Sequence, residues 1–382
     1  MSQIQSISEE LAKELMDEFS EGTGLRSDSE MKQKRYLWTD ALALQNFLAL
    51  ASLYDEKEYE ETIRELINKV HHTLGKFDQN DSRSGWISDL PEEEAQKHPT
   101  VKGLRIGKPQ PERKQSEPFN DRKEWDRDGQ YYHYHTRWIH ALLQASENLD
   151  IKEWKQHAVE LSLAGRHFLQ KTDGRFHLYW KMSVDLSYPQ VPTMGAHDPL
   201  EGYLTALECE MLSSAKYDFT EYLQKLEKIC EGQNWSTTDP LGLGGLLLNI
   251  VRSAELSRYM ILPESVKPKK LFKEAMSGLD TISNKLKVTD PAEYRLAFRE
   301  CGLSMGLRAL DHHRDLLIEN DLKLNKLEEN LGLAEDIESF WGQPENRKYS
   351  SYQDHLHINN VSLASSLLAE LKPEFYSTTV LG

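Results

Sequence analysis

Six long apolar segments recur along this chain of 382 residues and leave few folds open to it. They carry Leu, Ala and aromatic residues at helical spacing, and they lie at about 36–53, 130–148, 199–213, 240–258, 292–311 and 354–371. More polar amphipathic stretches alternate with them, at about 5–20, 56–75, 151–171, 216–231, 265–286 and 318–340. Only a helix that is buried all round tolerates apolar residues on every face. The pattern therefore predicts twelve helices, with an inner ring wrapped by an outer ring.

Three of the predicted inner helices begin with the same dipeptide. Asp198, Asp239 and Asp290 each precede a proline, and Asp followed by Pro suits the N-cap and first helical positions. Glu201 and Glu293 then fall three residues after their Asp, as in a capping box. The recurrence of the Asp-Pro dipeptide favours a repeated helix pair. It also leads us to interpret Asp198 as an N-cap rather than a catalyst.

The loops that enter the inner helices are far longer than those that leave them. Residues 76–129 and 172–197 exceed what is needed to join antiparallel helices. If the helices form a ring, these loops emerge on one rim, where sites are usually built and helix N-termini favour oxygen-rich ligands. Because no Pro, Gly or Ser-rich linker divides the series, we predict a single domain over residues 1–382, with loops 76–129 and 172–197 on the active-site rim.

Charge and composition exclude several classes of partner. The formal net charge of −16 repels nucleic acid and anionic membranes. The N-terminus lacks a basic region before an apolar run, and no apolar stretch reaches membrane-spanning length, so we expect a cytoplasmic protein. Three cysteines are too few for a disulfide framework or a tetrahedral zinc site. We predict no cofactor, no metal, no nucleic-acid partner and no membrane partner, and the oligomeric state stays open.

The densest chemical stretch is residues 124–138, which ends the longest loop and begins the second inner helix. It holds Trp125, Asp126, Asp128, Tyr131, His133 and Arg137. Such a density of titratable groups on a buried helix needs an aqueous cavity or an extensive hydrogen-bond network. The cavity is the functional interpretation. Core histidines satisfied by their neighbours are the alternative, because buried polar groups usually find partners.

Other candidates come from the remaining loops and from the last inner helix. They are Trp86 in the first long loop, Trp180, Lys181, Asp185 and His197 in the second, and Asp354 and His355 at the start of the last inner helix. Tryptophan with carboxylates and histidines is typical of a sugar site, where an aromatic face covers a pyranose and polar groups hold its hydroxyls.

Two further motifs carry weaker signals. His133 and His135 form a His-x-His pair, as does the segment 355–357, but residues two apart on a helix point about 200° apart, which disfavours a shared metal ion. Lys102, Arg105 and Lys108 are interleaved with two glycines. That segment favours a solvated turn slightly over an anion-binding loop or lid.

Taken together, these segments resemble the (α/α)6 toroid of the six-hairpin glycosidase superfamily, which includes glycoside hydrolases, unsaturated uronyl hydrolases and, with a closely similar barrel, sugar 2-epimerases. The resemblance covers nearly the whole chain and lies in its helix pairs, aromatic-rich inner helices and long loops. Segments 125–131 and 194–199 also look like those of bacterial proteins assigned to this superfamily. It implies an all-α (α/α)6 barrel of six helical hairpins and raises the prior for carbohydrate chemistry. No catalytic role is carried over from it.

Our leading hypothesis is a glycoside hydrolase acting on a small-molecule or oligosaccharide substrate. Such enzymes place two carboxyl groups across the scissile bond, and we predict that Asp128 and Asp185 are this pair, aided by His133 and His197. The predicted substrate contacts are Trp86, Trp125, Asp126, Tyr131, Arg137, Trp180, Lys181, Asp354 and His355.

Two other hypotheses stay open. The chain is an epimerase or isomerase if His133, His197 and His355 converge for proton transfer beside a sugar carbonyl. It is a non-catalytic toroid that binds a saccharide or a protein if the candidate carboxylates are caps or surface ion pairs.

Overall fold

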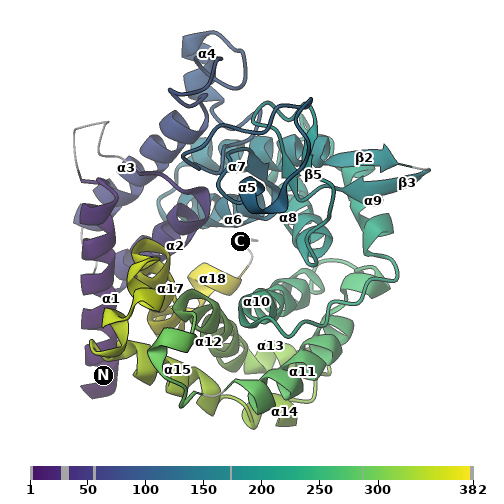
Figure 1. The fold of residues 1–382 in the computed structure, drawn as a ribbon. Helices are drawn as coiled ribbons and strands as arrows, with labels where there is room; N and C mark the ends of the chain where they lie inside the picture. Colours follow the sequence, from purple (N-terminus) through teal and green to yellow (C-terminus); the bar gives the residue numbers. More distant parts are fainter. Residues whose placement is uncertain (1–2, 27–33, 55–56, 173, 287, 379–382) are drawn as a thin grey trace. The chain divides into compact units, whose positions relative to one another are not determined.

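The computed structural model describes residues 3–26, 34–54, 57–172, 174–286 and 288–378. These residues form mostly α-helices, together with five short strands (Figure 1). The chain divides into two compact units, which are described separately. Within the described ranges, the first unit comprises residues 3–23, 45–54, 232–286 and 288–378, and the second unit comprises residues 24–26, 34–44, 57–172 and 174–231. The single domain predicted over 1–382 stays a prediction.

The second unit contains the helices that carry most of the candidate residues. They are the start of α2 (Leu37–Tyr54), α3 (Lys57–Leu74), α4 (Glu92–Lys97), α5 (Asp121–Glu124), α6 (Tyr132–Asn148), α7 (Lys152–Ala164), α8 (Asp198–Leu212) and α9 (Thr220–Cys230). Helices α6 and α8 pack against each other, α7 covers both, and α9 covers α8 (Figure 1). Both α6 and α8 are buried along most of their length, as expected for helices that are apolar on most faces.

Five strands hold the long loops of the second unit in place. β1 (Gln130–Tyr131), β4 (Lys181–Met182) and β5 (Pro189–Val191) form a three-stranded antiparallel sheet, in which Gln130 pairs with Met182 and Lys181 pairs with Val191. β2 (Leu169–Thr172) and β3 (Arg175–Leu178) form a separate hairpin. Because β1 runs directly into α6, the sheet fixes the loop that follows β3 against the first turn of α6.

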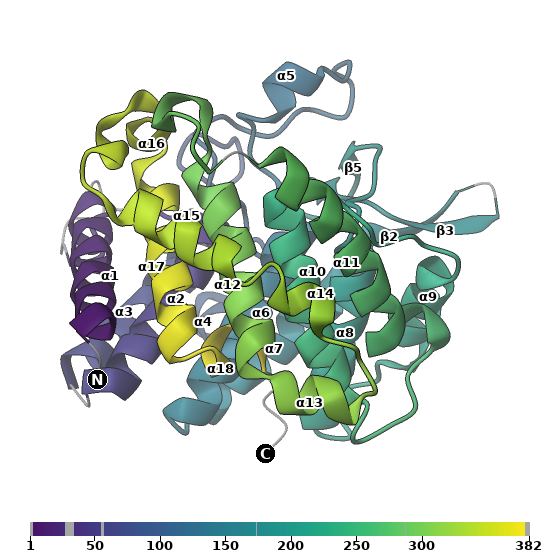
Figure 2. The same cartoon turned by 90° about the horizontal axis from the view of Figure 1, so that it is seen from below.

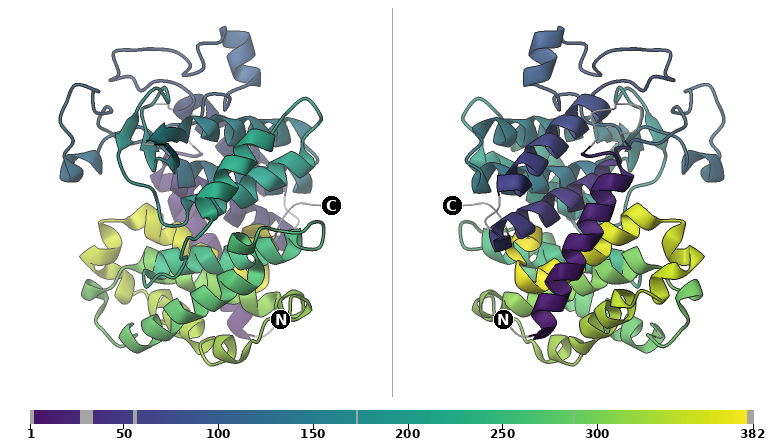
Figure 3. Two further views of the ribbon diagram at one scale, coloured as in Figure 1. Left: turned by 90° about the vertical axis from the view of Figure 1, so that its right-hand side faces the viewer. Right: turned by 90° about the vertical axis from the view of Figure 1, so that its left-hand side faces the viewer.

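The first unit is built around a row of apolar helices. Its helices are α1 (Gln3–Gly22), the end of α2, α10 (Pro240–Leu256), α11 (Pro268–Lys285), α12 (Ala297–His312), α13 (Arg314–Glu319), α14 (Asn325–Glu328), α15 (Gly332–Gly342), α16 (Ser350–Gln353), α17 (Leu356–Leu371) and α18 (Glu374–Ser377). α10 packs on α12 and α12 packs on α17. α11 covers α10, α15 crosses α12 (Figure 2), and α1 runs beside α17 (Figure 3).

Small residues bring α10 and α12 unusually close together. A Cβ added at Gly244 would lie 1.9 Å from the carbonyl oxygen of Gly302, and one at Gly306 would lie 2.6 Å from the carbonyl oxygen of Gly244. Real Cβ atoms do not approach backbone this closely, so the helix contact requires glycine on both sides. Gly244 is therefore a packing residue at this contact.

Gly244→Ala is therefore expected to destabilise the protein by about 1–3 kcal/mol, the usual cost of overpacking a tight core. An Ala in a helix interior would otherwise stabilise by up to about 1 kcal/mol. Urea unfolding followed by circular dichroism measures the difference. Gly332→Ala is the matched control, because an added Cβ there meets open space. An unchanged or raised stability of Gly244→Ala would contradict the close contact.

The helices match the predicted segments except at three places. The predicted helix 151–171 ends at Ala164 and continues as a 3-10 turn and β2, where Gly174 at φ +81° serves the following turn. The predicted helix 318–340 is broken into α13, α14 and α15, and Asp321 at φ +58° lies in the first break. The predicted start at residue 292 is also wrong, because α12 begins only at Ala297.

The three Asp-Pro dipeptides that were predicted to start inner helices have different outcomes. Asp239 is the N-cap of α10 and accepts a hydrogen bond from the backbone N–H of Gly242 at 2.9 Å, so that prediction is confirmed. Asp290 precedes only a short 3-10 turn. Asp198 is the first residue of α8, and the N-cap of that helix is His197. The N-cap interpretation of Asp198 is therefore wrong.

Over the described ranges, no helix has both the length and the apolar character needed to cross a membrane.

Candidate active site

Four side chains of the second unit form an aromatic wall, which consists of Trp125, Tyr131, His133 and Trp180. The rings of Tyr131 and Trp180 stack with centroids 4.8 Å apart, and His133 lies nearly parallel to Trp180 with centroids 6.2 Å apart. Trp125 meets the edge of Trp180 at 5.6 Å. Trp125 is 55% exposed, and Trp180 and His133 are half-buried. The wall therefore presents aromatic surface of the kind that covers a sugar ring.

The environment of His133 fixes its protonation state. The indole Nε1–H of Trp180 donates to Nδ1 of His133 at 3.2 Å. Burial lowers the pKa of His133 to about 4, a net effect in which the charge of Glu201 opposes burial and that of Arg137 adds to it. The imidazole is therefore neutral at pH 7, and because Nδ1 accepts a hydrogen bond, its proton is on Nε2. In this tautomer His133 offers a hydrogen-bond donor.

Two carboxyl groups at the start of α8, Asp198 and Glu201, are held in different environments, and we call them the α8 carboxylates. Thr136 donates through its hydroxyl to Oε2 of Glu201 at 3.1 Å, and Nη2 of Arg137 lies 3.4 Å from Oε1. Asp198 is buried, and its Oδ2 has no hydrogen-bond partner in the described residues. Burial and the charge of Glu201 raise the pKa of Asp198 well above its usual value.

The spacing of the α8 carboxylates suits acid/base chemistry. Residues i and i+3 lie on one face of a helix, so Asp198 and Glu201 face the same side of α8. A carboxyl group whose pKa is raised, beside an ion-paired carboxylate, is the arrangement that separates an acid from its ionised partner.

Asp128 has a different environment from the α8 carboxylates. Arg105 binds its Oδ2 in a fully buried ion pair, while Oδ1 accepts from the backbone N–H groups of Gly107, Lys108 and Gly129. Four donors occupy the acceptor sites of a carboxylate. Asp128 thus holds the 102–108 segment against the start of β1. Arg105 of that segment, a candidate for binding an external anion, binds the carboxylate of Asp128 instead.

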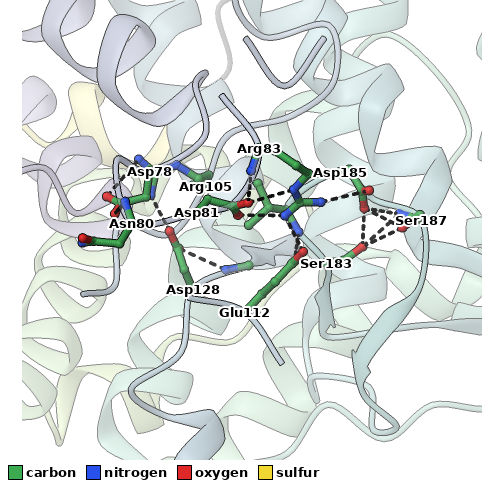
Figure 4. Close-up of polar contacts among 12 residues, drawn as sticks. Asp78, Asn80, Asp81, Arg83, Arg105, Glu112, Asp128, Ser183, Asp185 and Ser187 are labelled. Atoms are coloured by element: carbon green, nitrogen blue, oxygen red, sulfur yellow. Dashed lines mark hydrogen bonds and ion pairs between the residues drawn. The ribbon is translucent and has the colours of Figure 1, made fainter. Parts of the chain in front are cut away.

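Asp185 belongs to a neighbouring polar network centred on Arg83 (Figure 4). Arg83 binds Asp81, Glu112 and Asp185 at 2.9, 2.5 and 3.1 Å. Oδ1 of Asp185 also accepts from the hydroxyls of Ser183 and Ser187. Burial opposes these contacts, but the serines and Arg83 together lower the pKa of Asp185. It is therefore ionised at neutral pH and, like Asp128, is already surrounded by donors.

The remaining candidates of the second unit are placed as follows. Trp86 is buried away from the aromatic wall and donates to Glu92 at 2.8 Å. Lys181 is fully buried and donates to two backbone carbonyls and to Glu124. Asp126 is exposed and His197 is buried. The structure thus brings together Trp125, Tyr131, His133, Arg137 and Trp180.

Asp354 and His355 belong to the first unit, where they are exposed at the start of α17. His355 is the N-cap residue of that helix, without a capping side-chain hydrogen bond. Their predicted role as substrate contacts stays a prediction.

The two histidines of the 133–135 pair contact different partners. His135 is 1% exposed, and its Nε2 lies 3.0 Å from the carbonyl oxygen of Leu104, whereas the half-buried His133 bonds to Trp180. His135 thus fits the interpretation as a core histidine, and the functional interpretation of His133 stays a prediction. Over the part of the chain that the structure describes, no group of three His, Cys, Asp or Glu side chains is placed to hold a metal ion.

The buried His135 gives a testable pH dependence of stability. Burial lowers its pKa in the folded protein to about 4, while the unfolded chain titrates near about 6.5. Stability from this group is present above pH 6.5 and is lost as pH falls toward 4, by about 3 kcal/mol at most. Urea unfolding at pH 7 and pH 4.5 measures the loss. It should shrink in His135→Gln but not in His72→Gln, an exposed histidine; equal losses in both would contradict this assignment.

Sequence reasoning missed Glu201 as a site residue. Its signal was present, because Glu201 follows Asp198 by three residues, but that spacing was interpreted as a capping box. Only the position of Arg137 and Thr136, one turn into α6, distinguishes the two interpretations.

No protein-family model matches the chain, and no curated protein matches it. Solved structures do. The structure is similar to the α-1,6-mannanase GH76A of Salegentibacter sp. HEL1_6, with a TM-score of 0.52 and 11% identity over 96% of this chain and 99% of that chain. It is also similar to an inactive variant of that mannanase in complex with α-1,6-mannotetrose, with a TM-score of 0.54 and 10% identity over 95% of this chain and 98% of that chain.

At this identity the likeness shows the fold. The chain has the all-α (α/α)6 fold of six helical hairpins. The fold class predicted from the sequence is confirmed.

Proposed function

We propose that the chain is a carbohydrate-active enzyme of the glycoside hydrolase type, with Asp198 as general acid and Glu201 as its ionised partner. The observation that carries the proposal is the pair of α8 carboxylates, one with a raised pKa and one bound by Arg137 of α6, the helix that also carries His133 of the aromatic wall. The fold shared with the mannanase structures adds support by analogy.

The division of roles follows from the environments of the two groups. Asp198 carries the proton that the leaving-group oxygen needs, because burial and the charge of Glu201 disfavour its ionised form. Glu201 is held by Thr136 and Arg137, contacts that suit an ionised carboxylate acting as base or nucleophile. The pair Asp128 and Asp185 stays a prediction, and its full sets of donors favour a structural role.

The aromatic wall supplies a surface for the sugar. Tyr131, which is 3% exposed, stacks against Trp180 from behind, and the exposed part of the half-buried Trp180 suits the apolar side of a pyranose. Nε2–H of His133 donates to a sugar hydroxyl, because Trp180 holds the ring in that tautomer. The partly exposed Trp125 extends the surface.

The tautomer of His133 also favours hydrolysis over epimerisation. Proton abstraction beside a carbonyl needs a free imidazole lone pair, and the Nδ1 lone pair of His133 accepts from Trp180. An epimerase that uses His133 as base would first have to break this hydrogen bond.

The substrate we propose is an oligosaccharide. The mannanase complexes contain α-1,6-mannotetrose and α-1,6-mannotriose, and mannose-containing oligosaccharides are therefore the first to test. In the inactive mannanase variants two consecutive aspartates are replaced. The present sequence has no two consecutive aspartates, so its catalytic carboxylates do not reproduce that pair.

Hydrolysis in H2(18)O tests the proposal. The purified chain is incubated with a panel of α- and β-linked oligosaccharides, and the products are analysed by mass spectrometry. Hydrolysis adds one heavy oxygen to each new reducing end. Products of unchanged size that instead acquire deuterium in D2O would overturn the proposal in favour of an isomerase.

A further inference from the structure

Residues 113–127 of the second unit enclose a cavity that the proposed reaction does not use. Its empty volume is about 530 Å3, including open solvent. The lining residues are Arg113, Glu117, Pro118, Phe119, Asn120, Lys123, Glu124 and Arg127. Figure 2 shows α5, which carries Lys123 and Glu124, at the tip of the loop. We propose that this cavity, the 113–127 pocket, is an accessory site for a sugar unit that carries an acidic group.

The pocket is built before any ligand arrives. Arg113 donates through Nη1 to the carbonyl oxygen of Glu117 and through Nη2 to that of Gln190, both at 2.9 Å. The carbonyl oxygen of Arg113 in turn accepts from the hydroxyl of Tyr188 at 2.7 Å and from Nε2 of Gln190 at 2.9 Å. These bonds tie the loop to β5, so little ordering is needed on binding.

The charges of the pocket favour an anion. Glu117 is paired with Arg127 at 2.8 Å, and Glu124 is paired with Lys181 at 3.0 Å and with Arg113 at 3.4 Å. Both carboxylates of the lining are thus neutralised by cations. Lys123 lines the pocket and has no ion pair with any described residue. Its ammonium group remains for a ligand carboxylate or phosphate.

The walls of the pocket point to a sugar rather than to a bare anion. Phe119 is 44% exposed and offers an apolar face next to Pro118. Trp125 follows α5 directly and contacts Trp180 of the aromatic wall. An oligosaccharide held by the wall therefore continues over Trp125 toward Phe119. This last step rests on the proposed function, whereas binding of an acidic sugar by the pocket does not.

Calorimetric titration of the full chain tests the inference with three probes: D-glucuronate, D-glucose and inorganic phosphate. We expect glucuronate to bind more tightly than either of the others, because it combines an anion with a pyranose face. Lys123→Gln should weaken glucuronate binding about tenfold, the effect of losing one charge-assisted hydrogen bond. Lys123→Arg should retain binding. Phe119→Ala should weaken glucuronate without changing phosphate.

Lys114→Gln is the matched control, because Lys114 is an exposed lysine of the same loop that does not line the pocket. The inference would be overturned if glucose or phosphate bound as tightly as glucuronate. It would also be overturned if Lys114→Gln and Lys123→Gln weakened glucuronate binding equally. Turnover is read separately in the H2(18)O assay. If glucuronate binding depends on Lys123 but no oligosaccharide is cleaved, the proposed function is wrong and the accessory site stands. If oligosaccharides are cleaved but glucuronate binding does not depend on Lys123, the accessory site is wrong and the proposed function stands.

Discussion

Glu201→Gln is expected to lower the rate of glycoside cleavage about a thousandfold while substrate affinity stays nearly unchanged. Gln retains the size and hydrogen-bonding oxygen of Glu but has neither the charge nor the basicity that the reaction requires. Asp198→Asn should have a similar effect, because an amide cannot donate the proton that the leaving group takes up. Initial rates and binding isotherms with one cleaved oligosaccharide separate kcat from affinity.

Two comparisons make this result specific. Glu210→Gln, at the other end of α8, should leave kcat within a small factor of the native value. Asp128→Asn and Asp185→Asn test the pair predicted from the sequence. Loss of turnover in those two variants with full turnover in Glu201→Gln would reject the α8 carboxylates and restore the original assignment.

The pH dependence of turnover gives a further check on the roles. Asp198 acts in its protonated form, and burial raises its pKa. Activity that depends on this acid is full below the raised pKa and is lost as pH rises through it. In Asp198→Asn, the fall of kcat with rising pH should disappear. If kcat falls in the variant as it does in the native protein, another group is responsible for this pH dependence.

Arg105→Met is expected to destabilise the protein by about 3–5 kcal/mol, because it leaves the carboxylate of Asp128 buried without its counter-charge. Both side chains of this ion pair are almost completely buried. Arg105 also donates to the carbonyl oxygens of Thr73 and Lys76, and these acceptors would lose their donor as well. Urea unfolding at pH 7, followed by circular dichroism, measures the loss.

Removal of the uncompensated negative charge of Asp128 should restore part of the stability. Asp128→Asn in the Arg105→Met background leaves no uncompensated anion, so the double variant should be more stable than Arg105→Met alone. Arg83→Met is the comparison for a more exposed arginine, with an expected loss of about 1 kcal/mol. A loss in Arg105→Met no larger than that in Arg83→Met would contradict the importance of the buried pair.

Most helices were predictable because their physical causes are local in the sequence. Apolar residues on every face mark α10 and α17, and amphipathic spacing marks α3 and α11. The failures occur where a few residues compete with that periodicity. Asp321 adopts a positive φ and interrupts an otherwise helical stretch, and the chain leaves the helix after Ala164 for a hairpin that pairs Leu169 with Leu178.

The candidate site was predictable in part. The density of aromatic and titratable residues around Tyr131 and His133 pointed to the first turn of α6, where the aromatic wall lies. Which carboxylates have unused acceptor sites depends on contacts between segments distant in sequence, such as Arg105 with Asp128 and Thr136 with Glu201. Spacing along one segment does not report those contacts, and a capping box and a catalytic pair have the same spacing.

Trp125, which packs edge-on against Trp180, is also placed to report ligand binding through its fluorescence. An indole that is 55% exposed emits at longer wavelength than one shielded from water, so a ligand that covers Trp125 shifts the fluorescence of the whole chain to the blue. Saccharide libraries are thereby open to rapid screening without labels, and Trp125→Phe identifies which of the eight tryptophans produces the signal.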